Sequence, residues 1–222
     1  MKVIKNILVA AACLAVTTFA IYGTLGDDTK QDQYIAIENV IQQRDADGEL
    51  IDFVTGRELL VTIGELTTES ITWENSASDT LYTNPNAVDK FVSVKNNGNT
   101  NAYVRTWFAF EMGNLTEEEF NSSVRLNINT SVWSWSEFEY DVAIDGQRYA
   151  VVWAEYSTAL PAGKTTTHPS LLQIVMTEDI LTIGGILDGN CDGKYEVKTY
   201  SRAVSDKNAW GSGELTHLWY DQ

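Results

Sequence analysis

The sequence predicts an all-β protein, a jelly-roll-like β-sandwich with one short helix and long loops. Three observations support this fold class. Apolar and polar residues alternate with a period of two in most segments beyond the N-terminus, turn signals recur about every 8–12 residues, and a single short segment has a helical pattern. The chain of 222 residues, 44% of them hydrophobic, can bury a sizeable core and lacks the composition of a disordered protein.

The first element is a targeting segment. Two lysines precede an apolar run from Ile7 to Ile21, which is the layout of a secretory signal peptide. Small residues permit cleavage after Ala20 or after Gly23, and we assign residues 1–23 to the signal peptide. The alternative is an uncleaved anchor, because the run approaches the ~20 residues that span a bilayer. We expect contact with a membrane through this uncleaved segment alone.

The acidity of the chain restricts its partners. There are 15 Lys and Arg against 31 Asp and Glu, a net charge of -16. Loss of the signal segment removes two lysines, so the mature chain has 13 basic and 31 acidic residues, or -18. Such a surface repels phosphate, and we therefore expect no nucleic acid partner. Cys191 is then the single cysteine, so the fold must be held together without an internal disulfide.

Strands are expected along the rest of the chain. A turn at Asn96–Asn99 separates two of them, and Asp145-Gly146 divides another stretch into a hairpin. Asp-Gly is the preferred dipeptide of a type I′ turn, which needs positive φ at both central positions. The predicted strand segments are residues 34–41, 58–63, 88–95, 102–111, 124–128, 140–144, 147–156, 171–176 and 195–204.

One helix is predicted, and it is short. Asn114 or Thr116 caps a segment that starts Glu117-Glu118-Glu119-Phe120. Ser, Thr, Asp and Asn side chains accept hydrogen bonds from the first free amides of a helix, and carboxylates favour its positive end.

Motifs of catalysis are absent from the sequence. It contains no HExxH, no GxSxG and no glycine-rich phosphate loop. His168 and His217 stand alone, whereas a zinc site needs three or four converging ligands. We therefore expect no catalytic residues, and two surface histidines.

One acidic loop has the spacing of a calcium site. Asp188, Asn190 and Asp192 place oxygen-bearing side chains at alternating positions, as in the first half of an EF-hand loop, and Glu196 offers a further oxygen. Thr199 stands where that loop has its bidentate Glu, and no helix is predicted on either side. A plain polar hairpin loop that binds no cofactor is the favoured interpretation, with calcium as the alternative. Calcium is the one cofactor for which the sequence offers ligands.

Two tryptophans suggest a glycan site. Trp133 and Trp135 project from the same face of one strand. Exposed coplanar indoles stack on sugar rings, whereas buried indoles fill a sandwich core, and the core is the favoured interpretation.

The segment Asp89–Phe110 resembles the strand-turn-strand phrase of exported proteins processed by the SipW-type signal peptidase, the TasA/camelysin-like family. Family members read VKNTGN…AYVR, and this chain reads VKNNGNTNAYVR from Val94 to Arg105. Three further stretches are similar to family segments: Gly23–Leu25 to GTLAYF, without the aromatic pair; Leu160–Lys164 with Pro169–Leu172 to LPAG…PSL; and Tyr195–Val204 to the penultimate strand.

The resemblance implies a jelly-roll sandwich that is secreted to the cell surface or biofilm matrix after processing by a SipW-type signal peptidase. TasA-like proteins form fibres by donor-strand exchange, in which the segment after the signal peptide completes a neighbour's sheet. Here that segment is residues 24–42, ahead of a single sandwich domain at 43–222. Its candidate donor-strand residues are Tyr34, Ile35, Ala36, Ile37, Val40 and Ile41. The alternative is a strand that pairs within its own subunit.

The sequence therefore predicts a non-enzymatic structural protein that self-associates into fibres. The camelysin branch of the family supplies a rival, a surface metallopeptidase, which would depend on His168 or His217. A glycan-binding sandwich is the third alternative.

Overall fold

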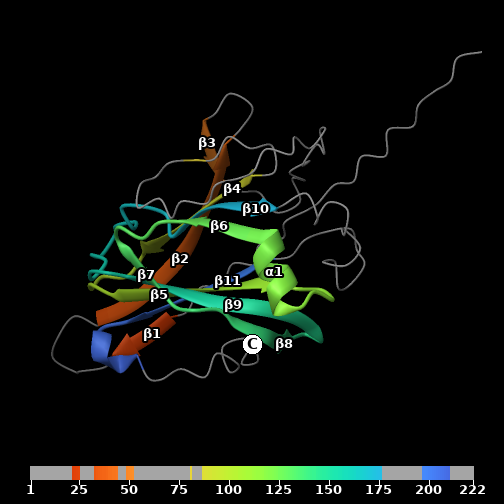
Figure 1. The fold of residues 1–222 in the computed structure, drawn as a ribbon. Helices are drawn as coiled ribbons and strands as arrows, with labels where there is room; N and C mark the ends of the chain where they lie inside the picture. The colour runs from red at the N-terminus through yellow and green to blue at the C-terminus, as the bar shows by residue number, and fades with distance from the viewer. Residues whose placement is uncertain are drawn as a thin grey trace, which may run out of the picture.

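The computed structural model describes residues 22–25, 33–44, 49–52, 81, 87–176 and 197–210. In these residues the chain forms two antiparallel sheets that pack face to face, with one short helix beside them (Figure 1). The predicted all-β sandwich is confirmed.

The first sheet is built around the long strand β2. Its strands lie in the order β1 (Tyr22–Leu25), β2 (Gln33–Arg44), β4 (Ala87–Asn96), β10 (Leu171–Met176) and β6 (Val124–Ile128), and β3 (Leu50–Asp52) also pairs with β2. One edge of β2 pairs with β4, and the other edge pairs with β1 near its start and with β3 at its end (Figure 1).

The second sheet has β5 near its centre. Its strands lie in the order β11 (Val197–Val204), β5 (Tyr103–Glu111), β9 (Gln147–Tyr156) and β7 (Trp133–Trp135), and β8 (Glu139–Ile144) also pairs with β9. From β4 onward the chain passes repeatedly from one sheet to the other, which is how a jelly roll is connected.

The predicted hairpin at Asp145-Gly146 is confirmed. Asp145 has φ 52° and Gly146 has φ 80°, and the turn joins β8 to β9. The predicted strands at 124–128 and 171–176 have the same bounds as β6 and β10, whereas the segment 58–63 lies outside the described residues. The turn at 96–99 does not close a hairpin, because β4 and β5 belong to different sheets.

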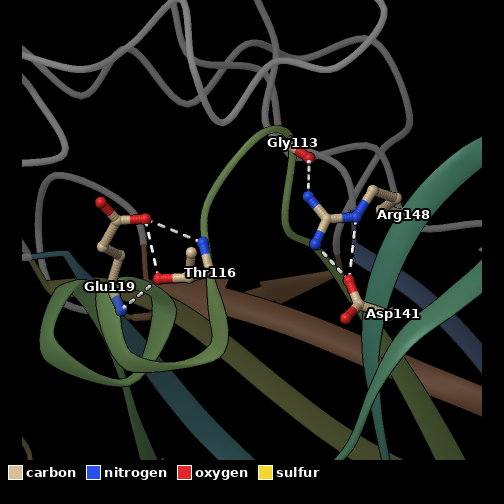
Figure 2. Close-up of polar contacts among 5 residues, drawn as sticks. All are labelled: Gly113, Thr116, Glu119, Asp141 and Arg148. Atoms are coloured by element: carbon tan, nitrogen blue, oxygen red, sulfur yellow. Dashed lines mark hydrogen bonds and ion pairs between the residues drawn. The ribbon is translucent and has the colours of Figure 1, made fainter.

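Helix α1 (Glu117–Ser123) begins at a capping box, as Figure 2 shows. Thr116 is the cap: its Oγ1 accepts from the Glu119 amide at 3.3 Å, and Glu119 Oε2 accepts from the Thr116 amide at 2.8 Å. The hydrogen bond from the Thr116 backbone lowers the pKa of Glu119. Phe120 anchors the helix in the core.

Arg148 joins strand β8 to the turn before α1 (Figure 2). Its Nη1 donates to the Gly113 carbonyl at 2.9 Å, and its Nε donates to Asp141 Oδ1 at 2.9 Å. Asp141 has φ 62° at an irregularity of β8, a conformation that Asp tolerates better than most residues. The ion pair therefore links this irregular part of β8 to the turn before α1.

The main core lies between the sheets, and a second cluster lies on the outer face of the five-stranded sheet. Successive residues of β5 contribute to each in turn: Phe108 and Phe110 to the main core, Trp107 and Ala109 to the outer cluster. The other outer members are Val142, Ile144, Tyr149, Val151 and Tyr200. The alternation predicted for β5 is confirmed, with both of its faces buried.

Candidate functional site: the seat of strand β2

Strand β2 contains all six candidate donor-strand residues. Three isoleucines on one face of the strand, Ile35, Ile37 and Ile41, belong to the main core and are 2–9% exposed. Ala36 is buried, Val40 is half-buried, and Tyr34 is 41% exposed. The apolar row of β2 is therefore a structural part of the sandwich interior.

The strand pairs within its own chain in this structure. The antiparallel ladder with β4 runs from Ile37 opposite Asn96 to Gln42 opposite Phe91. We use the term β2 seat for the surroundings that hold this strand, namely β4, the turn at residues 96–99 and β11.

The turn after β4 extends the ladder past the end of the strand. The amides of Asn97 and Gly98 donate to the Ala36 carbonyl at 2.7 and 3.1 Å. The Tyr34 amide donates to Asn99 Oδ1 at 2.9 Å, and the Asn99 amide donates back to the Tyr34 carbonyl at 3.2 Å. The Asn-Gly-Asn part of the sequence motif therefore binds the backbone of β2.

Two residues of the motif shape this turn. Asn96 is fully buried: its Nδ2 donates to the carbonyls of Thr100 and Leu160 at 2.8 and 3.0 Å, and its Oδ1 accepts from the Gly98 amide. A Cβ at Gly98 would lie 2.6 Å from the Tyr34 carbonyl oxygen. Glycine is required here because β2 lies directly against the turn.

A bidentate ion pair fixes the C-terminal end of β2 in the seat. Arg44 donates to both carboxylate oxygens of Asp89, from Nε at 2.5 Å and from Nη2 at 2.9 Å. The hydrogen bond to Asp89 raises the pKa of Arg44. Gln173 of β10 also donates to Asp89, at 2.8 Å. Paired guanidinium–carboxylate bonds define a geometry as well as an attraction, so they position the end of β2.

A buried lysine lies next to this ion pair in β4. Lys90 is 1% exposed, and burial lowers its pKa to about 7, against the opposing attraction of Asp89. Its protonation therefore changes near neutral pH, close to the end of the seat.

Two hydroxyl groups of the opposite sheet face β2. The nearer belongs to Ser201 of β11, and it donates to Oδ1 of Asn39 in β2 at 2.5 Å; Asn39 is 6% exposed. Ser201 Oγ lies 2.8 Å from Thr106 Oγ1 of β5. Sequence reasoning missed Asn39, because its partner lies 162 residues away.

The two tryptophans proposed for glycan binding face the sandwich core. Trp133 is 2% exposed, and its indole N–H donates to the His168 carbonyl at 3.0 Å. Trp135 is half-buried, donates to the Asn129 carbonyl at 3.0 Å and stacks on Phe108. They do share a face, as predicted, but it is the inner one, so they form no exposed platform for a sugar.

The calcium loop cannot be placed, since Asp188, Asn190, Asp192 and Glu196 all lie outside the described residues, as does His217. His168 is half-buried, and its Nδ1 lies 3.1 Å from Thr167 Oγ1. In the described ranges no three His, Cys, Asp or Glu side chains converge as metal ligands. No helix in the same ranges is long and apolar enough to cross a membrane.

A cation–aromatic cluster on the outer face of the second sheet was not predicted. The Arg105 guanidinium lies 4.1 Å from the Trp153 ring centre and 4.6 Å from that of Trp210, and donates to Glu155 at 2.6 Å. Burial raises the pKa of Glu155, but its hydrogen bonds and charge interactions with Arg105 and Lys207 outweigh this and leave it lowered. The cluster fastens the short turn η1 (Lys207–Ala209) to the sheet.

The chain matches no protein-family model, no curated protein and no solved structure. The resemblance to TasA/camelysin-like proteins therefore rests on the residues quoted from the sequence.

Proposed function

We propose that the protein is a secreted structural subunit of the cell surface or biofilm matrix, and that it self-associates by placing β2 in the seat of a neighbouring copy. One observation carries the proposal: β2 lies near the start of the mature chain and fills a seat made entirely by later parts of the chain, namely β4, the turn at residues 96–99 and β11. A second copy supplies an identical strand, so the same contacts can form between chains, as in domain swapping.

The energetics of the seat support this role. Burying an isoleucine side chain contributes about 1.5–3 kcal/mol, and β2 buries three of them. Without β2, the core and one edge of β4 would be open to solvent. An unpaired sheet edge is a template for another strand, so the seat must be filled from its own chain or from a neighbour.

The connection between strand and seat permits exchange. Residues 45–86 separate β2 from β4, a stretch of 42 residues. The entropy cost of joining the ends of a connection rises slowly with its length, so a strand on such a connection can serve either chain. β3 lies in this stretch and pairs with β2, so it would move with it.

Secretion and processing by a SipW-type signal peptidase belong to the same proposal. They are supported by the basic and apolar layout of the first residues and by the strong acidity of the mature chain. An acidic surface keeps exported subunits soluble until they meet a partner seat.

Mixing two cysteine variants tests the exchange directly. Val40 lies opposite Ser93 in the ladder, and both are half-buried. One mature preparation carries Val40→Cys and the other Ser93→Cys, each with Cys191→Ser. We expect a disulfide-linked heterodimer on oxidation, together with polymers under the electron microscope that are lost when residues 27–41 are deleted.

The matched control replaces Ser93→Cys with Ser134→Cys, on an exposed position of β7. Heterodimer yields equal to this control, from a protein that stays monomeric at every concentration, would contradict the proposed function.

A further inference from the structure

We infer that Asn39 sets the register of β2 in its seat and restricts the seat to strands with a carboxamide at that position, which makes a second copy of this chain the fitting partner. The selection of a partner rests on the proposed function. The control of register applies equally to a strand seated within its own chain.

Asn39 is the polar member of an otherwise apolar part of the strand. The core-facing positions of β2 run Ile35, Ile37, Asn39, Ile41 and Gln43, and all five are buried. Asn39 therefore sits at the centre of this row, with an isoleucine two residues away on each side.

Three side chains cross the sandwich at this point. Ser201 Oγ has one proton and gives it to Asn39 Oδ1 at 2.5 Å, so the 2.8 Å bond with Thr106 requires Thr106 Oγ1 as the donor. Ser201 and Thr106 are both fully buried and lie directly opposite each other in the pairing of β11 with β5. The second sheet thus presents one fixed hydroxyl to the incoming strand.

Apolar burial alone does not define the register. A slip of one residue would turn every isoleucine to the other face, which the core forbids. A slip of two residues keeps the same face inward and places Ile37 or Ile41 where Asn39 was. The isoleucine row tolerates that slip, because it repeats every two residues around Asn39.

The hydroxyl pair does not tolerate the slip. An isoleucine opposite Ser201 would leave the hydroxyl pair of Ser201 and Thr106 with one proton that has no acceptor, and the carboxamide would move away from its donor into the apolar interior. Buried polar groups without partners are strongly unfavourable. One register therefore satisfies both sheets.

A second observation is that part of the asparagine side chain is unsatisfied. Asn39 Nδ2 and Gln43 Oε1 are buried and have no hydrogen-bond partner within the described part of the chain. An aliphatic side chain would avoid that cost and add apolar contact. A buried polar residue kept at a cost in stability is the pattern that fixes register in coiled coils.

The test compares two disulfides within one chain. In a purified chain with Cys13→Ser and Cys191→Ser, Val40→Cys with Ser93→Cys reports the observed register, where the two residues are opposite. Val40→Cys with Lys95→Cys reports a slip of two, since these positions are diagonal neighbours in the observed register and too far apart for a disulfide. The yield of each bond under oxidation is read by mass spectrometry.

With Asn39 in place, we expect the first disulfide to exceed the second by about tenfold or more. Asn39→Val should lower that ratio about tenfold. Because this change also takes the acceptor away from Ser201, the denaturation midpoint is compared in the double variant Asn39→Val with Ser201→Ala, in which both partners are apolar and the midpoint should be unchanged or raised. Ser201→Ala should also lower the ratio of the two disulfides, because it removes the hydroxyl that donates to Asn39. Ile41→Val is the matched control: it trims the same row and should keep the ratio.

The inference is overturned by an Asn39→Val chain that keeps the ratio, or by a chain with both Asn39→Val and Ser201→Ala whose midpoint falls as far as that of an apolar truncation. These disulfides form inside one molecule, so the result stands whether or not fibres form. The mixed-copy experiment above decides the proposed function separately.

Discussion

Strands β2 and β5 both contribute a buried row to the main core, yet the protein holds them in different ways. β5 is paired on both edges, and its core-facing row ends in Phe108 and Phe110, which stack at 6.2 Å. β2 is paired along one edge by β4, and its other edge pairs with described strands only at residues 33–36 and 42–44. Its row contains Asn39, whose Nδ2 is unpartnered in the described residues.

The difference suggests a division of labour within one sandwich. β5 buries large apolar side chains on both faces, Phe108 and Phe110 on one and Trp107 on the other, and lies at the centre of the second sheet, so its removal would dismantle the fold. The contacts of β2 rely on backbone hydrogen bonds, three isoleucines and a small polar network. Strand positions with fewer satisfied contacts open at lower free energy than the core of a domain.

The largest effect is expected from a truncation in the core-facing row of β5. Phe108→Ala should lower the free energy of unfolding by about 3–5 kcal/mol, because Phe108 is fully buried and stacks on Phe110 and Trp135. Denaturant titration followed by tryptophan fluorescence measures it. A much smaller truncation in β2, Ile37→Val, should cost about 0.5–1.5 kcal/mol. A smaller loss for Phe108→Ala than for Ile37→Val would reverse the proposed division.

The next effect depends on pH and concerns the end of the seat. The pKa of Lys90 falls from its ordinary 10.5 to about 7 on folding, so the unfolded chain binds more protons between those values. Stability should therefore rise as the pH increases from about 7 towards 10, by roughly 2–4 kcal/mol. Lys90→Met should remove this rise, as measured by denaturant midpoints across that range. The same slope in both chains would show that another group is responsible.

A smaller effect tests the turn that holds the start of β2. Gly98→Ala places a Cβ 2.6 Å from the Tyr34 carbonyl, so the strand or the turn must shift, at a cost of about 1–3 kcal/mol. Hydrogen exchange should show faster exchange of the β2 amides with little change in β5. Asn97→Ala serves as the control, since it removes an exposed hydrogen bond to Glu38. Equal acceleration in both strands would mean that the turn supports the whole sandwich.

The smallest effect lies away from both strands. Arg148→Ala removes an exposed ion pair with Asp141 and a hydrogen bond to Gly113, and should cost about 0–1 kcal/mol. Thermal unfolding of this variant should resemble that of the parent. If Arg148→Ala lowered the free energy of unfolding as much as Phe108→Ala, the contacts of Arg148 would be a main support of the fold.

Much of the fold could be predicted because strand signals are local. The alternation of apolar and polar residues predicted the exact bounds of β6 and β10. The dipeptide Asp145-Gly146 predicted the turn of the hairpin. β1 and β3 were not predicted, since strands of four and three residues carry too little alternation to be recognised. Trp133 and Trp135 were placed on one face, but the pattern of a strand does not say which face is covered.

The seat itself could be predicted only in part. Residues 34–41 were recognised as a strand and 96–99 as a turn, each from neighbouring residues. Their contact depends on pairs such as Asn97 with Glu38 and Gln173 with Asp89, which are 59 and 84 residues apart. No local pattern records such pairs, so the chemistry of the seat had to come from the structure.

The position of β1 has a practical consequence for anyone who expresses this protein. β1 pairs Tyr22 with Ala36 and Leu25 with Gln33, so residues that follow either expected cleavage point lie along the edge of β2 that does not pair with β4. A cut after Ala20 leaves all four residues of β1, whereas a cut after Gly23 leaves two. A purification tag fused at this end would lie next to β1, beside the strand under study, so the cleavage point and the tag are experimental variables.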